Sequence, residues 1–173
     1  MMREFVLLAL LVVIGNAQAL SLFGIDPLNA GRDEVRAAAL ASGATNSRDA
    51  IPSPLYETFE AEQLLPGALR LYLGFEPETN TWAFAEYEFA GLTQPMILGI
   101  LRAKYGDPEQ TPARFVSDQA FHWRVDGVSI SLYQDWPEQR TRLLYQVPAR
   151  LSRLRAAQTG VGALRQPEQA NNL

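Results

Sequence analysis

The 173-residue chain has no cysteine, and this absence excludes several classes of protein at once. Without cysteine there is no disulfide framework, no thiolate metal site and no cysteine nucleophile. We expect no lipid anchor either, because bacterial lipidation requires a cysteine directly after the leader, where Leu20 and Ser21 stand. The stability of such a chain should come from its apolar core rather than from cross-links.

Basic residues other than arginine are almost absent. The chain holds one lysine (Lys104) and one histidine (His122), and its formal net charge is −4. Nucleic-acid binders normally carry a basic face, so we expect no nucleic-acid partner.

A Ser-His-Asp site would rest on His122 alone, which should point to solvent from a strand, and no Gly-x-Ser-x-Gly elbow is present. The chain is therefore not expected to be a hydrolase.

Long apolar runs are absent except at the start of the chain. Arg3 precedes an aliphatic stretch from Phe5 to Ile14, and Ala17-Gln18-Ala19 is a small-x-small cleavage sequence. This is the layout of a secretory signal peptide. The stretch is shorter than the about 20 apolar residues that cross a bilayer. We expect residues 1–19 to be a signal peptide cleaved after Ala19, and a periplasmic mature chain without a transmembrane segment.

The remaining sequence predicts two similar units after a short leading segment at 20–30. In the first unit, 31–90, a helix follows Gly31 and strand patterns cover 55–59, 69–75 and 82–89. In the second, 91–147, a helix follows Thr93, and strands at 121–125, 128–132 and 141–147 surround a tight Asp126-Gly127 hairpin. The predicted fold class is α+β: two tandem helix-strand-strand-strand modules whose antiparallel sheet packs against the helices.

A shift of sixty residues supports an internal repeat but does not fit every position. It superimposes turn residues, which internal duplication should preserve best: Gly67 on Gly127, Pro77 on Pro137, Glu78 on Glu138 and Thr81 on Thr141. The same shift places Leu71 on Ser131, on the opposite strand face from Ile130. Because a one-residue slip turns every side chain over, a bulge must differ between the halves, or the duplication is only architectural.

Two short motifs carry a resemblance to known modules. Gly31-Arg32-Asp33-Glu34-Val35 opens one helix, and Tyr105-Gly106-Asp107-Pro108 closes the other, each before a pair of strands. In this the chain resembles the β-lactamase-inhibitor-like fold, which includes the small lipoprotein of the outer-membrane β-barrel assembly machinery. The resemblance implies binding of other proteins rather than catalysis. The chain departs from that lipoprotein by lacking the lipidated cysteine.

Charge is distributed unevenly along the chain. Seven acidic residues and one arginine lie between Glu57 and Glu88, whereas six arginines and no acid lie between Arg140 and Arg165. The two regions either attract each other or are solvated on different faces. A basic helix from residue 148, with Leu151 and Leu154 on one side, is expected to pack internally or to fray, and weak contact with anionic lipid is an alternative. Residues after about 160 are expected to be a disordered tail.

The candidate binding residues lie on one strand and one loop. Glu86 and Glu88 share a strand face about 6.5–7 Å apart, and Trp82 and Phe84 are expected on that side, as in a sugar-binding strip. The spacing is near that of catalytic carboxylates, but one carboxyl would need burial to act as an acid. Trp136 and Pro137 are expected at a loop tip, where exposed aromatics often anchor protein interfaces; alternatively, Trp136 folds back over the sheet edge.

No cofactor or metal ion is expected. The loop oxygens of Glu76, Glu78 and Asn80 faintly resemble the start of a calcium loop, but Thr81 stands where the glycine should be. We therefore expect an exported, non-catalytic binding module that recognises a protein or another envelope component. The alternative is a small carbohydrate- or peptidoglycan-binding protein, possibly carbohydrate-active, that uses Trp82, Phe84, Glu86 and Glu88.

Overall fold

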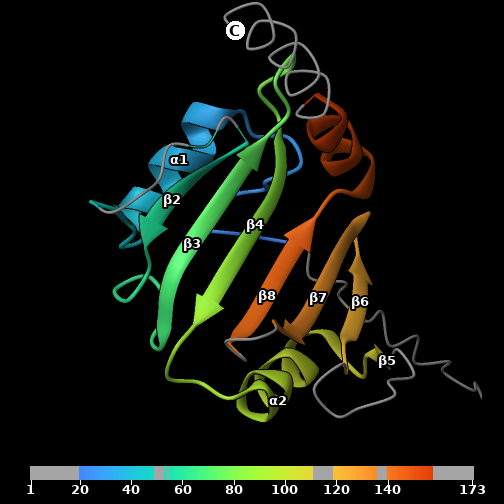
Figure 1. Cartoon of the computed structure of the whole chain (residues 1–173). Coiled ribbons are helices and arrows are strands. Elements are labelled where there is room, and N and C mark those ends of the chain that lie inside the picture. The colour runs from blue at the N-terminus through green and yellow to red at the C-terminus, as the bar shows by residue number, and fades with distance from the viewer. Residues whose placement is uncertain (1–19, 49–52, 54, 111–118, 136–139, 158–173) are drawn as a thin grey trace, which may run out of the picture.

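The computed structural model describes residues 20–48, 53, 55–110, 119–135 and 140–157, and its centre is one antiparallel sheet (Figure 1). Eight strands of the described chain form it in the order β1-β2-β3-β4-β8-β7-β6-β5. The strands are β1 (Thr45–Asn46), β2 (Tyr56–Glu60), β3 (Ala68–Phe75), β4 (Trp82–Phe89), β5 (Glu109–Gln110), β6 (Phe121–Val125), β7 (Val128–Gln134) and β8 (Thr141–Gln146). The helices are α1 (Arg32–Ala41), α2 (Gln94–Tyr105) and residues 148–157. The prediction of an α+β fold is confirmed.

Strands β1–β4 form one half of the sheet and β5–β8 the other. The halves meet where β4 pairs with β8 from Phe84 opposite Gln146 to Phe89 opposite Thr141. Each half holds four strands rather than the predicted three. The additional strands, β1 and β5, are two residues long and lie at the two edges of the sheet. A strand of two residues is too short to show the alternation on which a sequence-based prediction depends.

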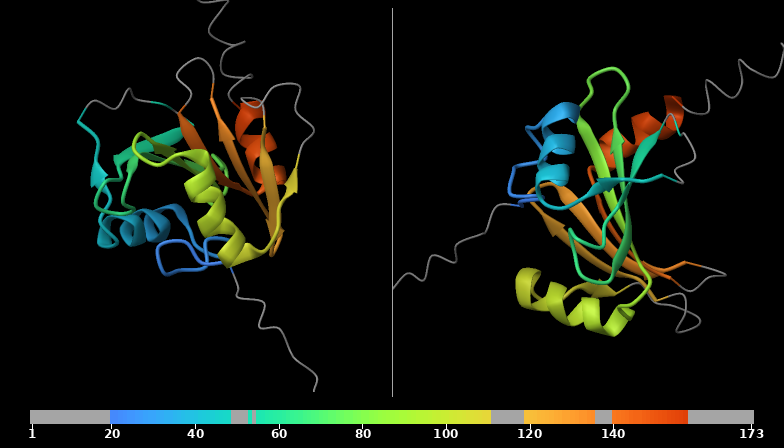
Figure 2. Two further views of the ribbon diagram at one scale, coloured as in Figure 1. Left: turned by 90° about the horizontal axis from the view of Figure 1, so that it is seen from below. Right: turned by 90° about the vertical axis from the view of Figure 1, so that its left-hand side faces the viewer.

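Helices α1 and α2 cover one face of the sheet (Figure 2). Val35 and Ala39 of α1 and Ile97 and Leu101 of α2 enter a single core that also takes buried residues from both halves of the sheet. The apolar residues Ile97, Ile100, Leu101 and Tyr105 predict one buried face for this helix, and for Ile100 this prediction is wrong, because Ile100 is 61% exposed. The buried pair 97 and 101 is spaced i, i+4, which turns position 100 away from the sheet.

The leading segment at 20–30 is tied into this core. Leu20 and Leu22 are buried, and the backbone N–H of Leu20 donates a hydrogen bond of 2.9 Å to Oδ2 of Asp126. Asp126 belongs to the β6–β7 hairpin, 106 residues away in the sequence. The predicted tight turn is confirmed there, since Asp126 and Gly127 have φ values of 50° and 83°, as a two-residue hairpin loop requires.

A bulge in β3 explains why the sixty-residue shift places Leu71, a core residue, on Ser131 instead of on a core residue of the second half. The pairing of β3 with β4 shifts register between Ala68 and Arg70, so Leu69 has no partner residue on β4. Beyond the bulge, Leu71 and Leu73 point into the core, as do Ile130 and Leu132 in the other half of the sheet.

The second face of the sheet, which we call the outer face, is partly covered by the helix at 148–157. Leu151 and Leu154 are buried against Ala83 and Phe84. Arg153 forms an ion pair with Glu76, and Arg150 donates hydrogen bonds to the carbonyl oxygens of Trp82 and Leu28. The prediction of internal packing is confirmed, because the two leucines that would have entered a lipid surface lie against the sheet.

Within the described residues no helix has both the length and the apolar character needed to cross a membrane. The predicted signal peptide at 1–19 and the tail at 158–173 lie outside the described residues.

Candidate functional site

The predicted strip on β4 is only partly brought together. Phe84, Glu86 and Glu88 lie on the outer face, whereas Trp82 is fully buried in the core on the opposite face. The expectation that Trp82 shares their face is wrong. In the β3–β4 pairing Gly74 faces Phe84 and Phe75 faces Trp82, so Ala83 is skipped and the strand turns over at this point. Trp136 and Pro137 lie outside the described residues.

The register of the sheet places alternating charges in one row across the outer face. Opposite one another on β2, β3, β4, β8 and β7 stand Glu60, Arg70, Glu88, Arg142 and Tyr133. The next row contains Tyr72, Glu86 and Leu144. Opposite charges on adjacent strands stabilise a sheet by about 0.2–1 kcal/mol for each pair. The acidic and arginine-rich regions of the sequence therefore attract each other, which was one of the two expectations.

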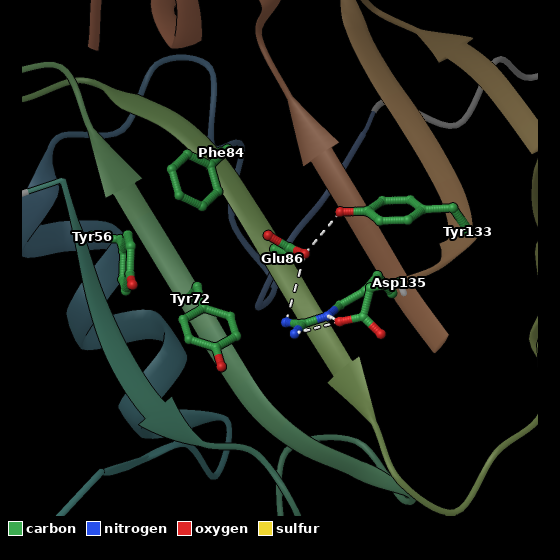
Figure 3. Close-up of a pocket in the computed structure, with 7 residues that line it drawn as sticks. Tyr56, Tyr72, Phe84, Glu86, Tyr133 and Asp135 are labelled. Atoms are coloured by element: carbon green, nitrogen blue, oxygen red, sulfur yellow. Dashed lines mark hydrogen bonds and ion pairs between the residues drawn. The ribbon is translucent and has the colours of Figure 1, made fainter. Parts of the chain in front are cut away.

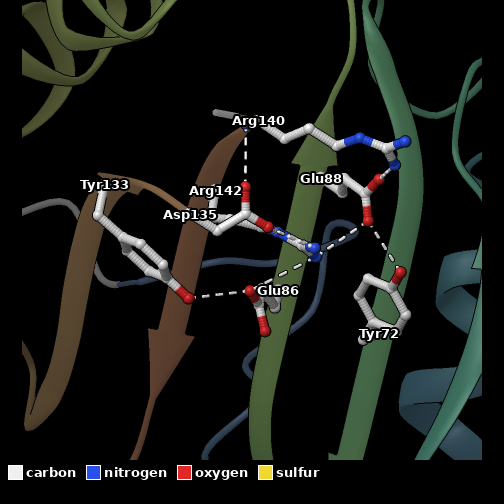
Figure 4. Close-up of polar contacts among 7 residues, drawn as sticks. All are labelled: Tyr72, Glu86, Glu88, Tyr133, Asp135, Arg140 and Arg142. Carbon is white, nitrogen blue, oxygen red and sulfur yellow. Dashed lines mark hydrogen bonds and ion pairs between the residues drawn. The ribbon is translucent and has the colours of Figure 1, made fainter. Parts of the chain in front are cut away.

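Arg142 is the centre of this network (Figure 4). Its Nε and Nη2 lie 2.9 and 2.8 Å from Oδ2 of Asp135, and its Nη1 lies 3.0 Å from Oε2 of Glu88 and 3.7 Å from Oε1 of Glu86. The guanidinium carbon lies 5.7 Å from the centre of the Tyr72 ring, within cation–π range. One side chain thus joins three carboxylates from β4 and the end of β7.

Glu88 is the most deeply buried charge of the network. Its side chain is 2% exposed, and it accepts a 2.9 Å hydrogen bond from the Tyr72 hydroxyl and pairs with Arg140 and Arg142. Burial of a carboxylate is tolerated only when it is paired and hydrogen-bonded, as here. This arrangement makes Glu88 a fixed support for its neighbours and not a group open to a ligand.

Glu86 is more accessible, with its side chain 22% exposed. The Tyr133 hydroxyl donates to Oε1 of Glu86 at 2.9 Å. Burial, followed by the charge and hydrogen bond of Glu86, raises the pKa of Tyr133 far above its ordinary value of 10.0, so this phenol remains a donor. For Arg142, burial disfavours the charged form and lowers the pKa. The hydrogen bond to Asp135 and the charge of Glu86 outweigh this effect, so the pKa of Arg142 is raised overall.

A hollow of about 340 Å³ opens beside Glu86 on the outer face (Figure 3). Its walls are mainly aromatic, and its polar groups belong to the network described above. The lining residues are Tyr56, Tyr72, Phe84, Glu86, Tyr133, Asp135 and Arg142. Tyr56 and Tyr72 meet edge to face with ring centres 5.4 Å apart. Gly74 contributes by having no side chain, because a Cβ there would overlap the Phe84 ring.

A second hollow of about 210 Å³ adjoins the first and reaches the helix at 148–157. The two share Tyr56, Phe84, Glu86 and Tyr133. The second adds mostly apolar groups, together with one arginine, from strands and helix: Leu55, Leu144, Leu151, Leu154 and Arg155. The first hollow is the more polar of the two, because Asp135 and Arg142 line it, the second is the more apolar, and Glu86 lies where they meet.

His122 was expected to point to solvent, but it is half-buried with its Nδ1 3.0 Å from the hydroxyl oxygen of Ser131. Glu109 stands opposite His122 on β5, which brings serine, histidine and carboxylate types into one row. Ser131 is only 7% exposed, so its hydroxyl is not presented to a substrate. Among the described residues no group of three or more potential ligands could hold a metal ion.

Sequence reasoning missed most of the hollow. It selected Phe84, Glu86 and Glu88 on β4, but not Tyr56, Tyr72, Tyr133 and Arg142 on β2, β3, β7 and β8, nor Asp135 directly after β7. The available signal was the strand alternation around Tyr72 and Arg142, which puts both on the polar face of their strands. The pairing of β4 with β8, which brings them together, has no local signature.

Neither a protein-family model nor a curated protein matches the chain. Among solved structures, the fold is similar to that of a DUF4309 family protein (YjgB) from Bacillus subtilis subsp. subtilis str. 168. The similarity has a TM-score of 0.40 at 11% sequence identity, and it covers 68% of this chain and 80% of that chain. These comparisons do not support the resemblance to the β-lactamase-inhibitor-like fold, and no residue role is transferred.

Proposed function

We propose that this protein is an exported, non-catalytic binding protein and that the paired hollows on the outer face are its recognition site. The main support is the hollow beside Glu86, where four aromatic rings surround a carboxylate whose neighbours are held by ion pairs. Binding sites typically combine apolar walls with a few fixed polar groups. Because the network already fixes these side chains, little side-chain freedom has to be lost on binding.

Export is part of the same proposal. The layout of residues 1–19 favours a leader that is cleaved after Ala19 and releases the chain into the periplasm. The buried position of Leu20 is compatible with a mature chain that starts at this residue. Expression of the whole sequence in a bacterial host, followed by mass measurement of the periplasmic product, tests this: the product should begin at Leu20.

We further propose that the two halves of the sheet are tandem modules. The strand order supports this, because β1-β2-β3-β4 is mirrored by β8-β7-β6-β5 and each half begins with a helix. Such an arrangement brings the last strands of the two modules together at the centre. The recognition site would then lie across the junction, since the strands that line it, β2, β3, β4, β7 and β8, come from both halves, and the helix at 148–157 completes it.

A protein partner is the first candidate, and a glycan such as peptidoglycan is the second. Aromatic side chains beside carboxylate and guanidinium groups also favour sugar binding, because a sugar ring can pack on the rings of Tyr56 and Tyr133. Trp82 is no longer part of this alternative, since it lies in the core.

The test uses protein purified from the periplasm and immobilised. Envelope proteins and peptidoglycan are passed over wild type, over a Tyr56→Leu/Tyr133→Leu variant that removes two phenols from the hollow, and over Glu62→Gln. Glu62 is exposed in the turn after β2 and serves as the control. A component retained by wild type and Glu62→Gln but lost from the double variant supports the proposal. Identical retention by all three, with the fold intact by circular dichroism, contradicts it.

A further inference from the structure

We propose that the hollow beside Glu86 binds a positively charged side chain, a lysine or arginine of a partner protein, with the charged end at Glu86 and the aliphatic stem toward the helix at 148–157. This inference rests on the proposed binding function and specifies its ligand. It follows from which hydrogen-bonding groups are already occupied, which charge predominates and what lines each end of the two hollows.

Arg142, the cation within the first hollow, is already engaged. Each of its three guanidinium nitrogens faces a carboxylate: Nε and Nη2 face Asp135, and Nη1 faces Glu88 and Glu86. An anionic ligand would have to displace one of these pairs and would meet three carboxylates while doing so. The hollow is therefore poorly suited to a carboxylate or phosphate.

Glu86, by contrast, has an oxygen to offer. Its hydrogen bond from Tyr133 and its ion pair with Arg142 both involve Oε1. Figure 3 shows the other carboxylate oxygen on the side of Phe84, away from Tyr133, and in Figure 4 it is turned away from Arg142. An ionised carboxylate only accepts hydrogen bonds, so this oxygen calls for a donor. A charged donor forms the strongest bond of this kind.

The local charge balance points the same way. Glu86, Glu88 and Asp135 supply three negative charges to the network, and Arg140 and Arg142 supply two positive ones. One negative charge is left in this network. The aromatic rings around Glu86 add to this, since the face of an aromatic ring attracts a cation. Arg142 already uses the Tyr72 ring in this way at 5.7 Å.

The second hollow suits an aliphatic stem. Leu144, Leu151 and Leu154 line it next to Phe84, and lysine and arginine bury their methylene groups along such surfaces. Glu86 also lines this hollow, so a stem that lies here can reach the carboxylate with its charged end.

The probe is the peptide acetyl-Ala-Lys-Ala-amide, compared with its norleucine counterpart, which has the same stem length without the charge. Binding to the full exported protein is followed by NMR of the tyrosine rings during titration. The lysine peptide should shift the signals of Tyr56 and Tyr133, and the norleucine peptide should bind at least about tenfold more weakly, since one charged hydrogen bond is worth at least that factor.

Two variants of equal charge change separate a local contact from a general effect. Glu86→Gln keeps the shape of the side chain and a hydrogen-bond acceptor for Tyr133, and it should weaken lysine-peptide binding about tenfold. Glu62→Gln should leave binding unchanged. Tyr56→Leu removes one aromatic face without changing charge and should weaken binding a few-fold. If Glu86→Gln proves unfolded, the Tyr56→Leu result and the comparison of the two peptides still test the inference.

Equal binding of the lysine and norleucine peptides, or equal effects of the two glutamine variants, would overturn the inference. A neutral peptidoglycan fragment that shifts the same tyrosine signals, when the lysine peptide does not, would overturn it as well but leave the proposed binding function intact. If no probe shifts these signals and the Tyr56→Leu/Tyr133→Leu variant retains every envelope component, both proposals fail.

Discussion

At the scale of single residues, the shape of the hollow depends on a contact between Gly74 and Phe84. The two stand opposite each other on β3 and β4, and the Phe84 ring lies over the position that a Gly74 side chain would occupy. This is a close approach that no other residue type allows. The orientation of Phe84, and with it one wall of the hollow, is therefore determined by the absence of a side chain on the neighbouring strand.

Gly74→Ala should destabilise the protein by about 1–3 kcal/mol, because the added methyl group must push the Phe84 ring aside. Gly99→Ala provides the opposite control. Gly99 is exposed within α2 with no atom near its Cβ position, so alanine there should stabilise by about 0.5–1 kcal/mol. Urea denaturation of the two variants measures both changes. Equal stability of Gly74→Ala and wild type would show that Phe84 moves freely.

The two glutamates of β4 should differ in their contribution to stability although they are two residues apart on one face. Glu88→Ala should cost about 3 kcal/mol or more, because it leaves the groups that surround a buried carboxylate without a partner. Glu86→Ala should cost about 1 kcal/mol or less, since its ion pair is partly exposed. Free energies of unfolding at neutral pH test this order, and a larger loss for Glu86→Ala would refute it.

At the scale of elements, the helix at 148–157 forms part of the site as well as of the fold. It closes one end of the second hollow, and two of its arginines attach it to the first half of the sheet. Its leucines were recognisable in the sequence because they are three residues apart and flanked by charge. Its docking position was not, since Glu76 lies 77 residues away from Arg153.

The attachment of this helix should weaken in acid. The hydrogen bond from Arg153 lowers the pKa of Glu76 below its ordinary value of 4.5, even though burial opposes this. A carboxyl whose pKa is lower in the folded state contributes its full stability above pH 4.5, and this contribution is lost as the pH falls through the folded-state pKa. The stability difference between wild type and Glu76→Gln should therefore be constant from pH 7 to 5 and shrink below that.

Circular dichroism-monitored unfolding of wild type and Glu76→Gln from pH 7 to 3 measures this difference. Glu78→Gln, an exposed substitution in the same turn, controls for general charge effects. A difference that stays the same down to pH 3 would mean that Glu76 does not hold the helix through its charge.

At the scale of the whole molecule, local patterns predicted the α+β class, helices α1 and α2 and the β6–β7 hairpin correctly, because each depends on residues near one another in the chain. The position of Trp82 was predicted wrongly because the skipped residue Ala83 reverses the alternation, and only the partner strand β3 reveals this. The hollow was not predicted for a related reason. Its two sides meet only through the β4–β8 pairing, which joins residues about sixty positions apart.

The shared core predicts that the two halves unfold together. Leu71→Ala in one half and Ile130→Ala in the other should each cost about 2–4 kcal/mol, since both side chains are fully buried. Each variant should still show a single transition with coincident fluorescence and circular dichroism curves. Two separated transitions in either variant would show that the halves are independent domains.

The hydrogen bond between Leu20 and Asp126 has a consequence for maturation. If the leader is removed after Ala19, the amide nitrogen of Leu20 becomes a terminal ammonium group facing a carboxylate 2.9 Å away. Cleavage would thus replace a hydrogen bond from a neutral amide to this carboxylate with an ion pair, which should add stability to the mature chain. Asp126→Asn should then cost about 1 kcal/mol more in a chain that starts at Leu20 than in one that retains Ala19. Removal of the leader would therefore stabilise the folded chain as well as release it.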